Sequence, residues 1–218
     1  MDTKLRNVIS MIFEKIYYFL TYSIVFVVTM VMGLGFLTFA GGHVMLFDLV
    51  KKIDGERYKE KIKVFKFFKE NIITDALKYL KISLLYVSLI LILAVDLFYF
   101  STSINPLFTG MFYLNIILAF VLINTMGISF YIMANYREMG FKEVIKNSIS
   151  IVVVNTIDFL VLNAFVVAIA IILYKISSLL LVLLLPGITI ELSYRFYKKI
   201  IAKESITYLL FNLKEQNH

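Results

Sequence analysis

The sequence predicts an all-α fold, a polytopic transmembrane helical bundle that forms a single integral membrane domain over residues 1–218. Apolar residues make up 61% of the chain and the mean hydropathy is +0.87, far above the range of soluble domains. The charged residues fall in clusters between apolar runs of about 20 residues, the length that crosses a hydrocarbon core. The absence of cysteine excludes disulfides and thiolate chemistry.

Five apolar runs are long enough to be membrane helices, given a rise of about 1.5 Å per residue and a hydrocarbon core of about 30 Å. Tilt of the helices absorbs any excess length. The runs lie at residues 16–34, 80–100, 107–133, 149–173 and 177–197. No linker or independently soluble domain separates them, so the chain is expected to be one membrane domain.

The distribution of basic residues favours a sixth span. The loop at residues 51–79 and the N-terminal flank are both rich in Lys and Arg, which favours the cytoplasmic side for both. Two crossings must then lie between them, and residues 36–50 supply the second. With six spans and both termini cytoplasmic, only Lys175 of the 22 basic residues lies outside.

The segment at residues 36–50 is short for a crossing, because its 15 residues span about 22 Å as a helix. Gly41, Gly42 and His43 also interrupt it. We expect a full crossing, and the alternative is a re-entrant or interfacial segment, since irregular backbone inside a membrane is tolerated only where protein surrounds it.

A basic amphipathic helix is predicted over residues 58–73. Apolar residues recur there at three- and four-residue spacing, with lysines on the other faces. Such a helix lies in the headgroup layer of the cytoplasmic leaflet or docks a partner subunit. The candidate contact residues are Phe65, Phe68, Lys69 and Asn71. Residues 200–213 repeat the pattern more weakly and predict a terminal interfacial helix.

Three polar residues near the middle of the run at residues 149–173 are candidates for an intramembrane polar site. Asp158 follows Asn155 by three residues and precedes Asn163 by five, which places them on roughly one side of a helix. The functional interpretation is a binding site or proton relay at the membrane midplane. The alternative, which we favour, is interhelical hydrogen bonding that holds the bundle together.

Other polar positions in the spans have structural interpretations. Asp96 lies about one turn from the outer end of its span, where water and headgroups reach it. Glu191 and Arg195 have the spacing and orientation of a favourable ion pair along one helix. Pro186 is expected to kink the last span and to free backbone groups that need partners.

The residues needed for most enzyme chemistry are missing. The only histidines are His43 and His218, so no histidine pair for a metal or a catalytic triad is available. No HExxH, P-loop, GxGxxG or GxSxG motif occurs. We therefore predict no enzymatic activity, no metal site and no cofactor. The basic residues flank the apolar runs, which favours contact with lipid headgroups over nucleic acid.

Three segments carry a resemblance to a known family: GLGFLTFAGG at residues 33–42, FKFFKEN at residues 65–71 and LLLPGITIELSYRFYKKI at residues 183–200. Over most of residues 10–200 the chain resembles the YesL-like bacterial membrane proteins, a family of unknown function. Phe65, Phe68, Lys69 and Asn71 match the family's aromatic and basic pattern, while its proline before the threonine of the turn is missing here. The resemblance implies a bacterial plasma membrane protein that acts beside carbohydrate ABC importers.

Three functions follow from these observations. The first is a non-enzymatic membrane subunit that supports carbohydrate uptake, bound to the permease of an ABC importer. The second is a small carrier, as a monomer or homodimer, with Asn155, Asp158 and Asn163 along its path. The third, which we rank lowest, is a membrane enzyme acting on lipid or glycan.

Overall fold

The structure, a computed structural model, describes the backbone of residues 3–33, 36–55, 64–102 and 105–215 and the side chains of residues 8–33, 36–54, 66–102 and 105–202. All regular structure in these ranges is helical, which confirms the predicted fold class. The helices in the described ranges are α1 (Thr3–Met32), α2 (Phe39–Gly55), α3 (Val64–Lys78), α4 (Leu80–Ser101), α5 (Pro106–Asn135), α6 (Phe141–Val154), α7 (Thr156–Ile176) and α8 (Ser178–Glu215).

Five helices in the described part of the chain are long and apolar enough to cross a membrane. They are Val8–Met32 within α1, α4, α5, α7 and Ser178–Ala202 within α8. The chain is therefore a multi-pass membrane protein by the length and composition of its helices. Helix α2, which contains most of the predicted span at residues 36–50, is not one of the five, because it has only 17 residues.

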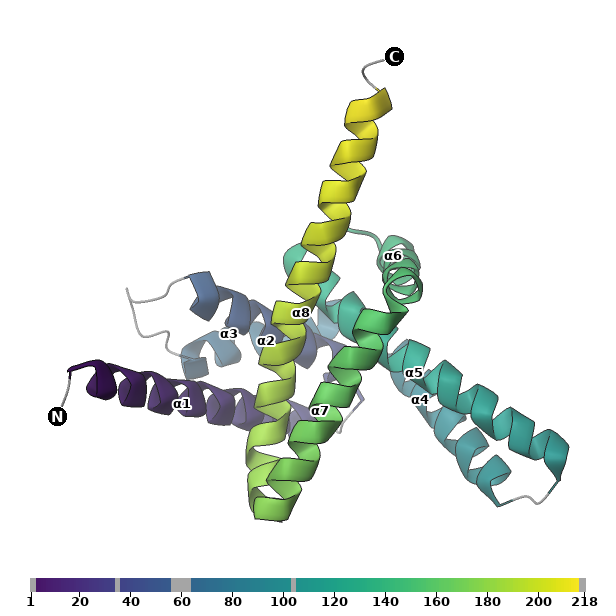
Figure 1. Ribbon diagram of the computed structural model, residues 1–218, viewed down its shortest axis with the longest axis horizontal. Coiled ribbons are helices and arrows are strands. Elements are labelled where there is room, and N and C mark those ends of the chain that lie inside the picture. The colour runs from purple at the N-terminus through teal and green to yellow at the C-terminus, as the bar shows by residue number, and fades with distance from the viewer. Residues whose placement is uncertain (1–2, 34–35, 56–63, 103–104, 216–218) are drawn as a thin grey trace.

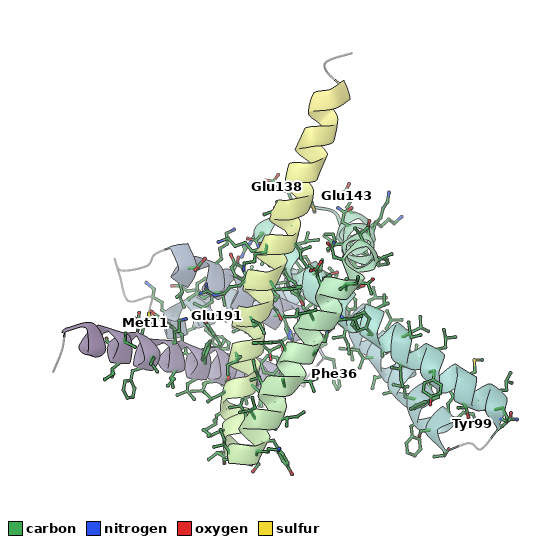
Figure 2. The ribbon with its side chains drawn as sticks, viewed as in Figure 1. Met11, Phe36, Tyr99, Glu138, Glu143 and Glu191 are labelled. Atoms are coloured by element: carbon green, nitrogen blue, oxygen red, sulfur yellow. The ribbon has the colours of Figure 1, made fainter. Side chains whose placement is uncertain are left out.

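Two helical hairpins, α4–α5 and α7–α8, extend away from the centre of the molecule (Figure 1). The first turns at Asn105, whose side chain accepts the backbone N–H of Leu107 at 3.0 Å and caps α5, with Pro106 at the first helical position. Tyr99 lies at the far end of this hairpin (Figure 2). The outer parts of both hairpins expose large apolar side chains, among them Leu91, Phe98, Leu107, Tyr174 and Leu179. Such surfaces are suited to lipid or to another membrane protein.

Helix α2 lies at the centre, packed against α1, α3, α4, α5 and α8. Nearly all of its apolar side chains are buried, including Val44, Met45, Leu46, Phe47, Leu49 and Val50. A helix that is apolar on all sides must be enclosed, and here protein encloses it. Because protein and not lipid surrounds α2, the helix does not need the length of a membrane span.

Helix α3 packs antiparallel to α2. Gly41 of α2 lies against the α3 backbone, where an added Cβ would come within 2.7 Å of Asp75 and Ala76. At the other end of the pair, the Lys52 ammonium lies 4.2 Å from the ring centroid of Phe67. The predicted amphipathic helix therefore exists, but it begins at Val64 within the described residues and packs against α2 along part of its length. Residues 58–63 of that prediction lie outside the described residues.

The structure divides the predicted span at residues 149–173 between two helices, because the helix breaks at Asn155. Asn155 ends α6 and precedes α7, with φ −107° and ψ 31°. Its side-chain amide donates to the carbonyl oxygen of Ile151 at 2.9 Å, the competition with backbone bonding that makes asparagine a poor residue inside helices. The Thr156 hydroxyl also donates to backbone carbonyls of the preceding turn. The helix of this region that is long and apolar enough to cross a membrane is α7.

Helix α8 continues through both Pro186 and the tail. The predicted terminal helix at residues 200–213 is the end of α8 and not a separate element. At Pro186, the next N–H, that of Gly187, donates to the Ser23 hydroxyl of α1 at 2.9 Å. Gly187 also allows the two backbones to meet, since an added Cβ would lie 2.1 Å from the carbonyl oxygen of Phe19.

Candidate functional site

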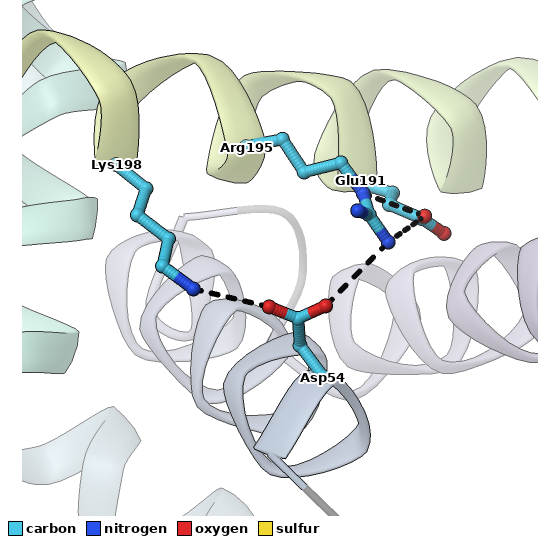
Figure 3. Close-up of polar contacts among 4 residues, drawn as sticks. All are labelled: Asp54, Glu191, Arg195 and Lys198. Carbon is cyan, nitrogen blue, oxygen red and sulfur yellow. Dashed lines mark hydrogen bonds and ion pairs between the residues drawn. The ribbon is translucent and has the colours of Figure 1, made fainter. Parts of the chain in front are cut away.

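Charged residues gather where the C-terminal half of α2 meets α8 and the connection after α5. The Asp54 carboxylate of α2 pairs with Lys198 at 3.1 Å and with Arg195 at 3.7 Å, both from α8 (Figure 3). Asp48, one and a half turns earlier in α2, pairs with Arg137, which follows α5. The two acidic residues of α2 therefore tie the central helix to two much longer helices.

The ion pair predicted between Glu191 and Arg195 is present. The Arg195 side chain donates to Glu191 at 2.8 and 2.9 Å while it also faces Asp54, so that one guanidinium links α2 to α8 (Figure 3). The five donors of a guanidinium allow this double engagement. The Arg195 side chain is 43% exposed, so water weakens each pair and the main effect is to orient α2.

A recess of about 910 Å³ lies beside this charged end, between α2, α3 and the α5–α6 connection. Its walls contain charged, amide and aromatic side chains, including Lys51, Lys52, Phe67, Asn71, Asn135 and Arg137. The volume falls in the range of small-molecule and headgroup sites. This recess is the candidate binding site of the described part of the chain.

The junction of α2, α5 and α8 is filled by aromatic side chains. The ring of Phe47 of α2 lies 6.1–6.2 Å, between centroids, from the rings of Tyr131, Tyr194 and Tyr197. The ring of Tyr131 lies 5.3 Å from that of Tyr194 and 5.9 Å from that of Tyr197. All four residues are at most 5% exposed. Close aromatic packing of this kind excludes water from the junction of α2, α5 and α8.

His43 occupies a similar apolar setting in α2. Its Nδ1 donates to the Phe39 carbonyl at 2.7 Å, and its ring lies 4.9–5.3 Å from the rings of Phe26, Phe39 and Phe130. Among the described residues, no three His, Asp or Glu side chains are close enough to hold a metal ion. His43 is therefore part of the aromatic packing.

A chain of buried hydroxyls, which the sequence reasoning missed, joins three helices. The Tyr86 hydroxyl of α4 bonds to Ser129 of α5 at 2.6 Å, and Ser129 donates to Ser148 of α6 at 2.9 Å. Ser148 in turn donates to the carbonyl of Val144 at 2.7 Å. Serines within apolar runs were a signal for such contacts, because small hydroxyl residues let membrane helices approach and bond.

The three residues of the predicted intramembrane site are not on one polar path. Asn155 forms the corner between α6 and α7, and Asp158 is exposed in the first turn of α7, where an acidic side chain suits the helix dipole. Asn163 of α7 donates to Asn124 of α5 at 2.9 Å. The Asn163–Asn124 bond is an interhelical contact of the kind that the structural alternative requires.

The predicted interfacial residues on α3 have different surroundings. The side chain of Phe65 lies outside the described residues. Phe68 is half-buried against the core, and Lys69 is exposed. Asn71 lines the recess and donates to the Phe67 carbonyl at 2.8 Å.

A buried carboxylate near the end of α3 was also missed. Asp75 is 3% exposed, and its Oδ2 has no hydrogen-bond partner among the described residues. Burial raises the pKa of this carboxyl, although Lys78 opposes the shift. Burial and the nearby Asp75 raise the pKa of Tyr79 to about 12, so that phenol is neutral at physiological pH.

No protein-family model, curated protein or solved structure matches this chain. The YesL-like resemblance therefore stays a prediction from the three sequence segments that carry it.

Proposed function

We propose that this chain is a non-enzymatic subunit of the bacterial plasma membrane that supports carbohydrate uptake by binding the permease of an ABC importer. The observation that carries the docking role is the α4–α5 hairpin. Its outer part exposes Leu91, Val95 and Phe98, and the same helix bears the half-buried carboxylate Asp96. Carbohydrate uptake and the class of importer come from the resemblance alone.

Asp96 distinguishes the α4–α5 hairpin from the rest of the apolar surface. It lies five residues before the end of α4, and within the described part of the chain it has no ion-pair or hydrogen-bond partner. An ionisable side chain in a membrane span normally pairs or faces a polar interior. Water and headgroups reach Asp96 near the end of its span, and a donor on a partner helix would replace that water. The apolar side chains around Asp96 supply packing area for the partner.

The centre of the bundle also favours a subunit over a carrier. The junction of α2, α5 and α8 is filled by Phe47, Tyr131, Tyr194 and Tyr197. The residues of the alternative carrier path are separated, with Asn163 bonded to Asn124. The carrier, as a monomer or homodimer, is the second proposal and the membrane enzyme the third.

Affinity purification in mild detergent tests the docking proposal. The tagged full-length chain should retain a carbohydrate permease, and Phe98→Ser combined with Asp96→Asn should release it. Phe165→Ser on α7 is the matched control, because Phe165 is also an exposed phenylalanine on a membrane helix. Failure to recover a permease would refute the subunit role, and sugar uptake by vesicles containing only this chain would establish the carrier.

A further inference from the structure

The recess between α2, α3 and the α5–α6 connection lies at the end of a membrane-length helix. Helix α5 ends at Asn135, and both Asn135 and the following Tyr136 line the recess. The ends of membrane spans meet the headgroup layer, where tyrosine side chains gather. A ligand in the recess would therefore sit at the depth of lipid phosphates.

The charges around the recess leave an excess of cations. Arg137 is paired with Asp48, whose side chain is only 11% exposed, so these two charges offset each other. Lys51 and Lys52 remain as exposed cations, opposed by Glu138 on the connection after α5 (Figure 2). The net charge of the lining is thus positive, and Lys51 and Lys52 provide it.

The cation of Lys52 is held in place by an aromatic ring. Its Nζ lies 4.2 Å from the ring centroid of Phe67 on α3, within the range of a cation–π interaction. This contact orients one ammonium along the wall of the recess without neutralising its charge. Lys51, the adjacent residue, places a second ammonium at the same end of α2.

Two amides add neutral donors to the same wall. Asn71 donates one side-chain N–H to the Phe67 carbonyl at 2.8 Å, and Asn135 donates one to the Tyr131 carbonyl at 2.9 Å. Each carboxamide has two N–H donors, so each has a second one to offer. Ammonium groups combined with amide donors suit the several acceptor oxygens of a phosphate.

We propose that this recess binds the phosphate group of an anionic ligand, and that a phospholipid headgroup supplies it. The depth at the end of α5 favours lipid as the source, and basic pockets at the ends of membrane helices suit anionic headgroups. Free phosphate offers the same chemistry without the acyl chains. The inference concerns a site separate from the α4–α5 hairpin and does not depend on the partner proposed for that hairpin.

Lipid titration of the delipidated full-length protein in neutral detergent tests the site, with native mass spectrometry as the readout. Phosphatidylglycerol should bind more tightly than phosphatidylcholine. The double variant Lys51→Gln with Lys52→Gln should weaken phosphatidylglycerol binding roughly thirty-fold, since each cation near a lipid surface contributes about 1 kcal/mol. Lys146→Gln on α6 removes one positive charge at an exposed position outside the recess and should leave binding within about twofold of the wild type.

Two further measurements identify the source of the phosphate group and test how the charge of the lining affects lipid binding. Inorganic phosphate that binds alone and displaces the lipid would identify free phosphate as the source, whereas phosphate that fails to compete would identify the headgroup. Glu138→Gln removes the opposing carboxylate and should tighten phosphatidylglycerol binding. Equal binding of the two lipids, or equal losses in the lysine double variant and Lys146→Gln, would overturn the proposal.

Discussion

The backbone N–H of Ala40, in the first turn of α2, donates to the hydroxyl of Ser83, in the first turn of α4, at 2.9 Å. One turn later in α4, Tyr86 bonds to Ser129 of α5. These two bonds place the start of α2 near the level of Ser129, which lies six residues, or about 9 Å, from the end of α5 at Asn135. This register favours the re-entrant alternative for residues 36–50, because a crossing helix would begin near the opposite end of α5.

Cysteine labelling tests that register, and the chain has no native cysteine to interfere. Leu37, in the turn before α2, is 46% exposed, and Leu107, at the tip of the α4–α5 hairpin, is 68% exposed. A membrane-impermeant maleimide applied from outside should label Leu107→Cys and spare Leu37→Cys. Equal labelling of the two variants from outside would restore the full crossing and the six-span topology.

Loss of the Ser83 hydroxyl should destabilise the protein. Ser83→Ala leaves the buried N–H of Ala40 without its acceptor, which costs about 1–3 kcal/mol. The thermal unfolding temperature in detergent should fall measurably. Ser88→Ala on the same helix is the control, because Ser88 is exposed and its replacement should have little effect. Identical unfolding temperatures for the two variants would show that the bond from the Ala40 N–H to the Ser83 hydroxyl does not stabilise the protein.

Substitution of Gly187 should separate α1 from α8. In Gly187→Ala the new methyl group would meet the carbonyl oxygen of Phe19, a backbone atom that cannot move without shifting α1. Overpacking of this kind costs about 1–3 kcal/mol. Gly110→Ala in α5 is the matched control, since nothing lies within 4 Å of the added Cβ and the helix gains about 0.5–1 kcal/mol. A Gly187→Ala protein as stable as Gly110→Ala would contradict the close helix contact.

The α4–α5 hairpin could be predicted from the sequence because its signals are local. The predicted spans at residues 80–100 and 107–133 correspond to α4 and α5, and the turn between them carries its own cap in Asn105 and Pro106. Long apolar runs and turn residues are both visible in a short window of sequence. The helical bundle could therefore be predicted from hydropathy alone.

The centre of the molecule could not be predicted in the same way. Hydropathy does not change across Asn155, so the break between α6 and α7 depends on a side chain that competes for backbone bonds. The bond from Ala40 to Ser83 joins residues 43 positions apart, and no periodicity encodes such a partner. The recess likewise combines α2, α3 and the α5–α6 connection. Of the residues predicted to touch a lipid or a partner whose side chains the structure describes, only Asn71 lines it.

The buried carboxyl of Asp75 should make stability depend on pH. Burial raises its pKa above the ordinary value, so the folded protein binds this proton more tightly than the unfolded chain does. The stabilising effect of the proton is complete below the ordinary carboxyl pKa and is lost as the pH rises through the raised pKa. The stability of the wild type should therefore fall as the pH rises from the ordinary carboxyl pKa through the raised pKa, and Asp75→Asn should remove this fall.

Thermal unfolding of Asp75→Asn and the wild type across pH 4–8, roughly the range above the ordinary carboxyl pKa, measures the effect. The variant keeps the shape of the side chain and removes a buried charge, so at the upper end it should be more stable by about 1–3 kcal/mol. Glu70→Gln on the same helix is the control, because Glu70 is 58% exposed and pairs with Lys66, so its replacement should change little at any pH. A difference in stability between Asp75→Asn and the wild type that stays constant with pH would show that Asp75 is ionised alike in the folded and unfolded chain. A variant that is less stable than the wild type at every pH would show that the carboxylate has a partner that stabilises it.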